Sequence, residues 1–168
     1  MTLVSSVNSE AQHCEVFAQG LQLLKDDSVP QALQSFQHAY QIAPYDDFYH
    51  NKYASYYGLA RVLNGDKAGV ELCRDAASME RFDGDVFLNL ACAEWWMHSR
   101  KRTVNVLEKG LQIDHEHPGL NKFQQQLGAR TKTAISFIPR SSILNIALGK
   151  LVRKKVDAIE EWNIQQVL

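Results

Sequence analysis

The sequence predicts an all-α protein made of consecutive helical hairpins. Apolar residues recur every three or four positions along most of the chain, which is the spacing of one helix face. Capping signals and prolines divide the chain into segments of ordinary helix length, and only nine glycines and four prolines are present. The 168 residues suit one domain, and an apolar fraction of 45% is sufficient for a packed core.

The first hairpin is predicted over residues 9–44. Residues 9–12, Ser-Glu-Ala-Gln, have the pattern of a capping box at a helix start, and residues 1–8 before it are expected to form a flexible N-terminus. Residues 28–31 have the same pattern and place a proline in the first helical turn, where a missing amide is tolerated. Pro44 ends the second helix, because a proline disfavours helical geometry in the residue before it.

Two further hairpins are predicted over residues 48–81 and 85–115. Within the earlier one, Asn64-Gly65-Asp66 has the composition of a turn, and its aspartate can cap the following helix. Beyond Pro118, apolar residues at i, i+3 and i+7 predict a capping helix over residues 119–128. These apolar residues are Leu120, Phe123 and Leu127.

The three hairpins share one pattern of small and large residues. In each second helix a small or short residue, a larger apolar residue and another small residue follow at fixed spacing: Ala32, Phe36 and Ala39; Gly69, Cys73 and Ala76; Thr103, Leu107 and Gly110. The last members of these sets are 37 and 34 residues apart. The first helices carry small residues at equivalent positions, namely Gly20, Gly58 and Ala91. Because small residues let two helix backbones approach, we expect Phe36 to fill the space opposite Gly20 and to be fully buried.

This pattern resembles the tetratricopeptide repeat, a helix–turn–helix unit of about 34 residues. The first copy matches that family's spacing at Gly20, Ala32, Phe36, Ala39 and Pro44. Arg81 and His115 stand where the next two copies would have proline, and the tryptophan typical of the first helix is absent from all three. The resemblance covers residues 9–118 and implies a right-handed superhelical array of helix–turn–helix repeats with additional C-terminal helices.

The resemblance also implies a function and a binding surface. Proteins of this family hold a peptide or partner segment in a concave groove that is lined by the first helix of each hairpin. Relatives that grip a C-terminal carboxylate use lysine and asparagine at several groove positions, where this chain has Phe17 and Leu21, so an apolar or aromatic-anchored segment is the expected partner. The groove positions here are Phe17, Leu21, Leu24, Lys52, Ser55, Tyr56, Leu59, Leu88, Asn89, Cys92 and Trp96.

No motif of an enzyme is found in the sequence. The patterns of serine hydrolases, P-loop nucleotide binding, dinucleotide binding and zinc proteases are all absent. Residues 114–117, Asp-His-Glu-His, bring two imidazoles to a helix end, and we interpret them as a polar terminus and not as a metal site. The prediction is a non-catalytic scaffold without cofactor or metal. The alternatives are a chaperone of a secreted or membrane-associated client, and an enzyme or regulatory subunit with an unrecognised C-terminal site.

Charge divides the chain near Pro118. Residues 1–118 carry ten Lys/Arg and sixteen Asp/Glu, a net charge of −6, whereas residues 119–168 carry eight and three, a net charge of +5. Residues 129–168 form a basic segment with a predicted amphipathic helix. Its apolar stripe consists of Ile143, Leu144, Ala147, Leu148, Leu151 and Val152. Two interpretations stay open: the stripe caps the repeats, or residues 141–155 contact an anionic membrane surface or a partner's groove.

The remaining signals concern partners and location. An overall charge of −1 argues against a generally basic nucleic-acid-binding protein, so no nucleic acid is expected. No long uncharged apolar stretch and no secretory signal pattern occur, and three widely spaced cysteines suit reduced, buried thiols. These features predict a cytoplasmic protein. The segment from Phe137 to Leu151 is similar to tails of bacterial tetratricopeptide proteins, which implies a bacterial source.

Overall fold

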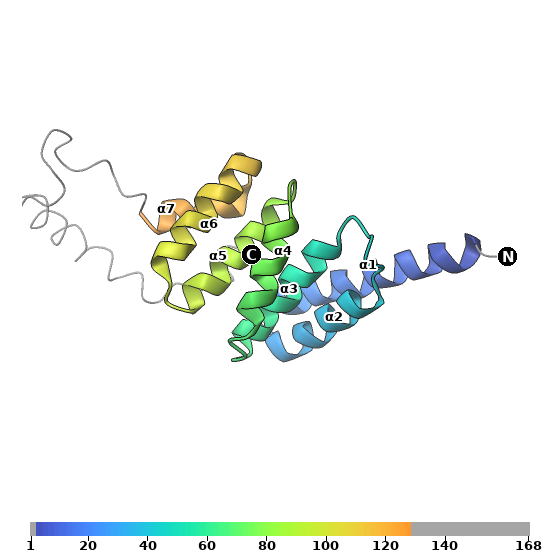
Figure 1. Ribbon diagram of the computed structural model, residues 1–168. Coiled ribbons are helices and arrows are strands. Elements are labelled where there is room, and N and C mark those ends of the chain that lie inside the picture. The colour runs from blue at the N-terminus through green and yellow to red at the C-terminus, as the bar shows by residue number, and fades with distance from the viewer. Residues whose placement is uncertain (1–2, 129–168) are drawn as a thin grey trace, which may run out of the picture.

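A computed structural model describes residues 3–128 of the chain, with side chains described from residue 14 onward. The predictions for residues 129–168, including the amphipathic helix and its apolar stripe, lie outside the described residues. In the described part the chain forms helices and no strand (Figure 1), which confirms the all-α prediction. The helices are α1 (Leu3–Lys25), α2 (Val29–Ile42), α3 (His50–Leu63), α4 (Gly69–Met79), α5 (Gly84–Trp96), α6 (Arg100–Ile113) and α7 (Pro118–Gln126).

The helices pack as three hairpins in chain order. Helix α1 pairs with α2, α3 with α4 and α5 with α6, and each hairpin packs on the next through the contacts of α2 with α3, of α4 with α5 and of α3 with α5. Helix α7 follows at the place of the predicted capping helix and contacts α5 and α6. The turns inside the hairpins lie along one edge of the molecule, and the connections between hairpins lie along the opposite edge (Figure 1).

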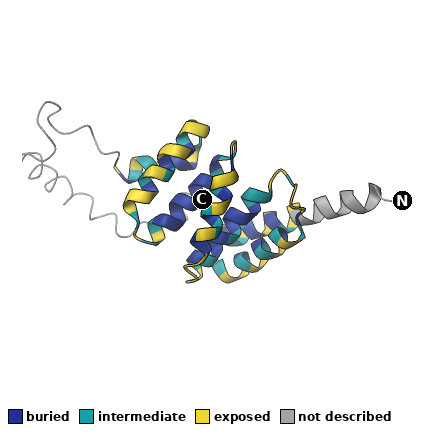
Figure 2. Cartoon of the chain, in the orientation of Figure 1, coloured by how far each residue is buried: buried dark blue, intermediate teal, exposed yellow. Residues whose placement is uncertain are grey.

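Burial is concentrated in the first helices of the second and third hairpins, α3 and α5 (Figure 2). Ten of the 13 residues of α5 are buried, and its apolar residues extend around the whole helix. A helix with apolar residues all round is stable only when other helices cover every side. Helix α5 meets that condition, since α3, α4, α6 and α7 all pack against it.

Two helix starts differ from the predictions. Helix α1 begins at Leu3 and passes through the predicted capping box at Ser9, because no proline or glycine interrupts the residues before it. Ser28 does precede α2, but its side chain makes no capping hydrogen bond. Its backbone N–H instead donates to the carbonyl of Leu23 at 2.8 Å, so the backbone turn and not the hydroxyl fixes this end of α2.

The turn inside each hairpin has the same backbone geometry. The second residue after the first helix adopts the left-handed conformation, with φ angles of 59°, 94° and 55° at Asp27, Gly65 and His98. The next residue donates its N–H to the carbonyl five positions earlier, at 2.8 Å for Ser28 to Leu23 and 2.9 Å for Asp66 to Arg61 and for Ser99 to Glu94. Because only one of the three left-handed residues is glycine, the sequence alone does not reveal this shared turn.

Inside the first hairpin, the packing predicted for Gly20 and Phe36 is confirmed. Phe36 is fully buried, and a Cβ atom added at Gly20 would lie only 2.6 Å from its Cε1 atom. The ring also packs against Phe17 and Tyr56, with centroid distances of 5.5 and 5.3 Å. The absence of a side chain at Gly20 therefore makes the space that the Phe36 ring fills.

The second hairpin uses the same device with two glycines. A Cβ at Gly58 would lie 2.7 Å from the Cys73 sulfur and 2.7 Å from the carbonyl oxygen of Gly69. A Cβ at Gly69 would meet the Gly58 carbonyl oxygen even more closely. The backbones of α3 and α4 thus contact one another directly, and neither can shift as the end of a flexible side chain could.

We predict that Phe36→Ala lowers the free energy of unfolding by about 3–5 kcal/mol, because it removes a fully buried ring and leaves a cavity. Urea denaturation followed by circular dichroism measures the change. Phe82→Ala is the matched control, since this ring is 76% exposed, and its effect should stay within about 0.5 kcal/mol. A loss below about 1 kcal/mol for Phe36→Ala would contradict the described packing.

We predict that Gly69→Ala also destabilises the protein, although alanine favours helices over glycine by about 1 kcal/mol. The added Cβ collides with backbone atoms of α3, and overpacking of this kind costs about 1–3 kcal/mol. Asp75→Ala, at an exposed position of the same helix, serves as the control. If Gly69→Ala raises the urea midpoint, the two backbones are further apart than described.

Candidate partner-binding surfaces

The predicted groove residues come together from α1, α3 and α5, but most of them are covered. The Phe17 and Tyr56 rings are 5.2 Å apart, and the Asn89 side chain donates to the Ser55 hydroxyl at 3.0 Å. Eight of the eleven residues are buried: Phe17, Leu24, Ser55, Tyr56, Leu59, Leu88, Asn89 and Cys92. They pack the first helices of the hairpins against one another and against their second helices.

The accessible part of the predicted groove is small. Leu21 and Lys52 are half-buried, and Trp96 at the end of α5 is 50% exposed. Helical spacing predicted that these residues share one face of each first helix, but spacing carries no information on how closely neighbouring helices approach. Whether a partner contacts these three side chains stays a prediction.

A second surface lies at the connections between the hairpins. Seven large apolar side chains are exposed in the part of the chain that the structure describes, and six of them lie in these connections or directly beside them. We define the junction edge as residues 43–49, 80–83 and 114–117 together with the flanking Met79 and Ile113. Its exposed apolar residues are Tyr45, Phe48, Tyr49, Met79, Phe82 and Ile113. Single exposed apolar residues are common in proteins, whereas a group of six at one edge makes that edge a candidate interaction surface.

The junction edge is also acidic. Its three connections contain six Asp/Glu residues against Arg81 as the one Lys/Arg. The acidic residues are Asp46, Asp47, Glu80, Asp83, Asp114 and Glu116. The edge therefore presents aromatic rings between carboxylates, a combination that favours a partner with both apolar and cationic side chains.

Glu80 holds the middle connection in shape. One carboxylate oxygen accepts the backbone N–H groups of Arg81 at 2.8 Å and Phe82 at 2.9 Å, and the other accepts the Asn51 side chain at 3.2 Å. Burial disfavours the charged form, but these backbone hydrogen bonds outweigh it and lower the pKa of Glu80. The bonds fix the loop from which the Phe82 ring projects, and they join this loop to α3.

Arg81 closes α4 at the position where the repeat pattern would have proline. Its guanidinium donates to the backbone carbonyls of Ser78 at 3.1 Å and Glu80 at 2.9 Å. These carbonyls belong to the last turn of α4 and to the residue after it, where a helix leaves acceptors unsatisfied and where positive charge is favourable. The arginine therefore ends the helix by hydrogen bonding, whereas a proline would end it by restricting the backbone.

A network of charged side chains links the starts of the helices that follow the three connections. The Lys52 ammonium lies 3.1 Å from Asp83 and 2.6 Å from Asp85, and His117 donates from Nε2 to Asp85 at 3.0 Å. The other ring nitrogen of His117 accepts the backbone N–H of Leu120 at 3.2 Å, which fixes the proton on Nε2 and caps α7. The network thus ties the N-terminal ends of α3, α5 and α7 together.

The network changes the acidity of its members. The hydrogen bond from His117 and the ion pair with Lys52 lower the pKa of Asp85 to about 2, although partial burial acts in the opposite direction. The same hydrogen bond with Asp85 raises the pKa of His117. Sequence analysis placed Lys52 in the groove and His117 in a polar helix end. Sequence spacing could not connect them, because their common partner Asp85 is brought between them only by the stacking of hairpins.

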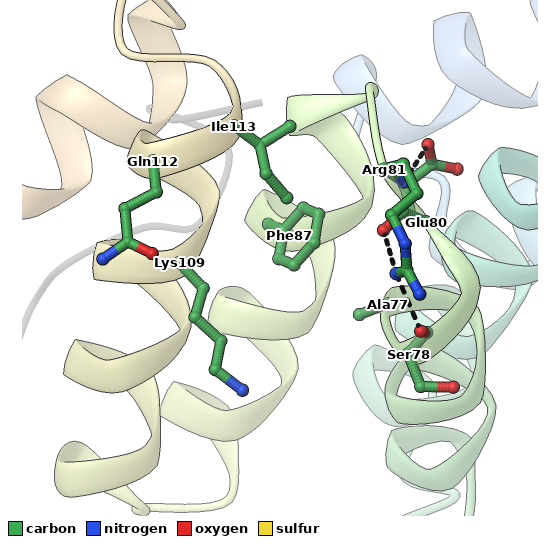
Figure 3. Close-up of a pocket in the computed structure, with 8 residues that line it drawn as sticks. All are labelled: Ala77, Ser78, Glu80, Arg81, Phe87, Lys109, Gln112 and Ile113. Carbon is green, nitrogen blue, oxygen red and sulfur yellow. Dashed lines mark hydrogen bonds between the residues drawn. The ribbon is translucent and has the colours of Figure 1, made fainter.

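A recess of about 300 Å³ opens between α4 and α6 beside the junction edge (Figure 3). The Phe87 ring forms its apolar floor, and Ile113 projects beside that ring. The side chains of Lys109, Gln112 and Arg81 line the rim of the recess. A recess of this size with an apolar floor and polar rim accepts one large apolar side chain of a partner. The repeat pattern gave no sign of it, because it forms between the second helices of two different hairpins.

The described residues include three cysteines, and two of them are buried. Cys73 and Cys92 are buried, and burial raises the pKa of the Cys73 thiol to about 12. Cys14 is exposed, contrary to the expectation of buried thiols, and its sulfur lies 3.6 Å from the Tyr53 hydroxyl. Within residues 14–128, no group of three or more His, Cys, Asp and Glu side chains is arranged to hold a metal ion.

Comparisons of the chain with protein-family models, with curated proteins and with solved structures found no match. Among the helices that the structure describes, none has the length and apolar character needed to cross a membrane.

We predict that Asp85→Asn lowers the free energy of unfolding at pH 7 by about 1–2 kcal/mol. The folded-state pKa of Asp85 lies below its ordinary value of 3.8, so its contribution is complete above about pH 4 and disappears as the pH falls towards 2. Urea denaturation at pH 7 and pH 2.5 should show the difference from wild type shrinking with acid. Asp75→Asn, on the exposed side of α4, is the control and should show neither effect.

Proposed function

We propose that this chain is a non-catalytic protein–protein interaction scaffold of the tetratricopeptide type, with three hairpins and α7 as a cap. The buried repeat positions support the proposal, since Ala32, Phe36 and Ala39 and their counterparts in the other two hairpins are all buried. The shared left-handed turn supports it independently. A right-handed superhelical arrangement of the hairpins belongs to this proposal.

A third shared feature is the end of each second helix. The residue after the helix donates its N–H to the carbonyl of the last small residue of the repeat pattern, at 3.0, 3.1 and 2.8 Å for Ala39, Ala76 and Gly110. In each case the small residue is buried, and the chain turns away from the helix at the same point relative to it. The repeat pattern therefore sets where each connection begins, and so where the junction edge lies.

The exposed aromatic side chains of the junction edge carry the proposal. Phe48 is 72% exposed and Phe82 is 76% exposed, whereas the other phenylalanines of the described residues are buried: Phe17, Phe36, Phe87 and Phe123. Aromatic residues are enriched among the residues that dominate protein interfaces, because each buries a large area with few rotatable bonds. We infer that the junction edge binds a partner segment, and that the recess between α4 and α6 receives one of its apolar side chains.

The experiment compares two variants of the full chain. Phe48→Ser/Phe82→Ser removes two rings of the junction edge, and Trp96→Ser removes the exposed aromatic residue of the sequence-predicted groove. Each protein is used to capture binding partners from extracts of the source organism, with quantification by mass spectrometry. We expect the double variant to lose its partner by roughly 30-fold or more, because interface aromatics of this kind contribute about 1 kcal/mol or more each.

The two surfaces give opposite results in this experiment. A partner that is lost with Trp96→Ser and retained by Phe48→Ser/Phe82→Ser assigns binding to the groove and contradicts the junction edge. A partner retained by both variants contradicts both surfaces. Thermal melts of all three proteins confirm folding, and they should agree closely because the replaced side chains are half-exposed or more.

A further inference from the structure

The chain itself carries a segment whose chemistry is complementary to the junction edge. Residues 129–155 contain seven Lys/Arg residues and no Asp or Glu. The apolar stripe from Ile143 to Val152 lies within the same segment. We propose that residues 129–155 occupy the junction edge in the free protein, so that a partner has to displace them. Displacement by a partner rests on the proposed function, whereas occupancy of the junction edge by residues 129–155 does not.

Charge complementarity is the first argument. The connections of the junction edge carry six Asp/Glu residues and one Lys/Arg, whereas the segment carries seven Lys/Arg and no acid. With Arg81 counted in full, the connections still carry five more acidic than basic side chains. Asp83 is partly compensated by Lys52, but the Glu116 side chain is 87% exposed and Asp46 is exposed as well. Opposite charge at close range favours association, and salt weakens it.

Apolar complementarity is the second argument. The segment's stripe contains six apolar residues. To be removed from water, these residues need a surface that is itself apolar and exposed. Six of the seven exposed large apolar residues of the described chain belong to the junction edge. Helix α7 offers less of such a surface, since its own large apolar residues are already buried: Leu120 and Phe123, with Leu127 directly after it.

The reach of the chain is the third argument. The end of α7 lies at the opposite edge, where the Arg100 guanidinium at the start of α6 donates to the Leu127 carbonyl at 3.0 Å. The 14 residues of α6 separate the two edges by about 21 Å. Residues 129–140 span up to about 40 Å when extended. The stripe that begins at Ile143 can therefore return to the junction edge of the same molecule.

The proposal is tested by limited trypsin digestion of the full chain, because the segment offers trypsin seven cleavage sites. Mass spectrometry gives the cleavage rates after Arg140, Lys150 and Arg153. We expect Phe48→Ser/Phe82→Ser to raise these rates about tenfold, since cleavage follows the population of the undocked segment. Trp96→Ser, at the opposite edge, should leave them unchanged. Raising salt from 50 to 500 mM should accelerate cleavage in the wild type and much less in the double variant.

Three results would overturn the proposal. Equal cleavage rates in wild type and the double variant show that the junction edge does not protect the segment. An equal increase in Trp96→Ser shows that protection comes from elsewhere. Protection that grows with protein concentration places the segment on a second copy of the chain and not on its own junction edge. Circular dichroism of each variant verifies that the helices are intact.

Failure of this proposal and failure of the proposed function are distinguishable, because digestion involves no partner. Unprotected segments with partner capture that still depends on Phe48 and Phe82 would leave the scaffold function in place. If the segment is protected as expected, Arg153→Gln/Lys154→Gln/Lys155→Gln should weaken its docking and increase partner capture by the full chain. A decrease in capture with this triple variant would contradict competition between the segment and the partner.

Discussion

The close packing of paired helices at glycines, seen in the first hairpin at Gly20 and in the second at Gly58 and Gly69, is the constraint on which this structure depends. At Gly58 and Gly69 the backbones themselves are in contact, and at Gly20 the missing side chain is replaced by the ring of Phe36. Such contacts fix the distance and the rotation of the paired helices, because moving either helix would create a void or a collision. Once that geometry is set, the first helix of each hairpin presents a second face to the next hairpin, and stacking buries it. The hairpins therefore form a continuous core in chain order, and α5 can be apolar around its whole circumference.

Polar contacts at one edge then determine how successive hairpins are oriented. Glu80 receives the Asn51 side chain, and Asp85 joins Lys52 of α3 to His117 at the start of α7. These groups are partly buried, where unpaired charges would be costly, so their geometry has to be satisfied together. The same contacts hold the connections between hairpins in defined shapes. As a consequence, the Phe82 ring projects from an ordered loop, which on the proposed function lowers the entropy lost when a partner binds.

The sequence was informative where structure follows from local spacing. Helical periodicity predicted the hairpins, and the recurrence of small residues predicted that Phe36 would be fully buried opposite Gly20. It was less informative where two interactions compete for the same group, as at Ser28, whose backbone turn and not its hydroxyl defines the helix start. The depth of the groove residues was also hidden, because spacing identifies a face but not the distance to its neighbour, and Ser55, Asn89 and Cys92 are completely covered. Aromatic residues such as Phe48 and Phe82 give no sign of exposure in the sequence, since outside a periodic segment they are indistinguishable from core residues.

The two edges of the molecule therefore have different physical roles. At the edge that holds the hairpin turns, backbone hydrogen bonds and left-handed residues close each helix pair, and short connections leave little room for additional side chains. At the opposite edge the connections join hairpins whose relative position is already fixed by helix packing and by the Lys52–Asp85–His117 network. The exposed rings of Phe48 and Phe82 contribute little to the core there and increase the apolar surface in water. On the proposed function, a partner or residues 129–155 cover that surface part of the time. The free protein and the partner-bound protein would then differ in what covers the junction edge, and not in the arrangement of the helices beneath it.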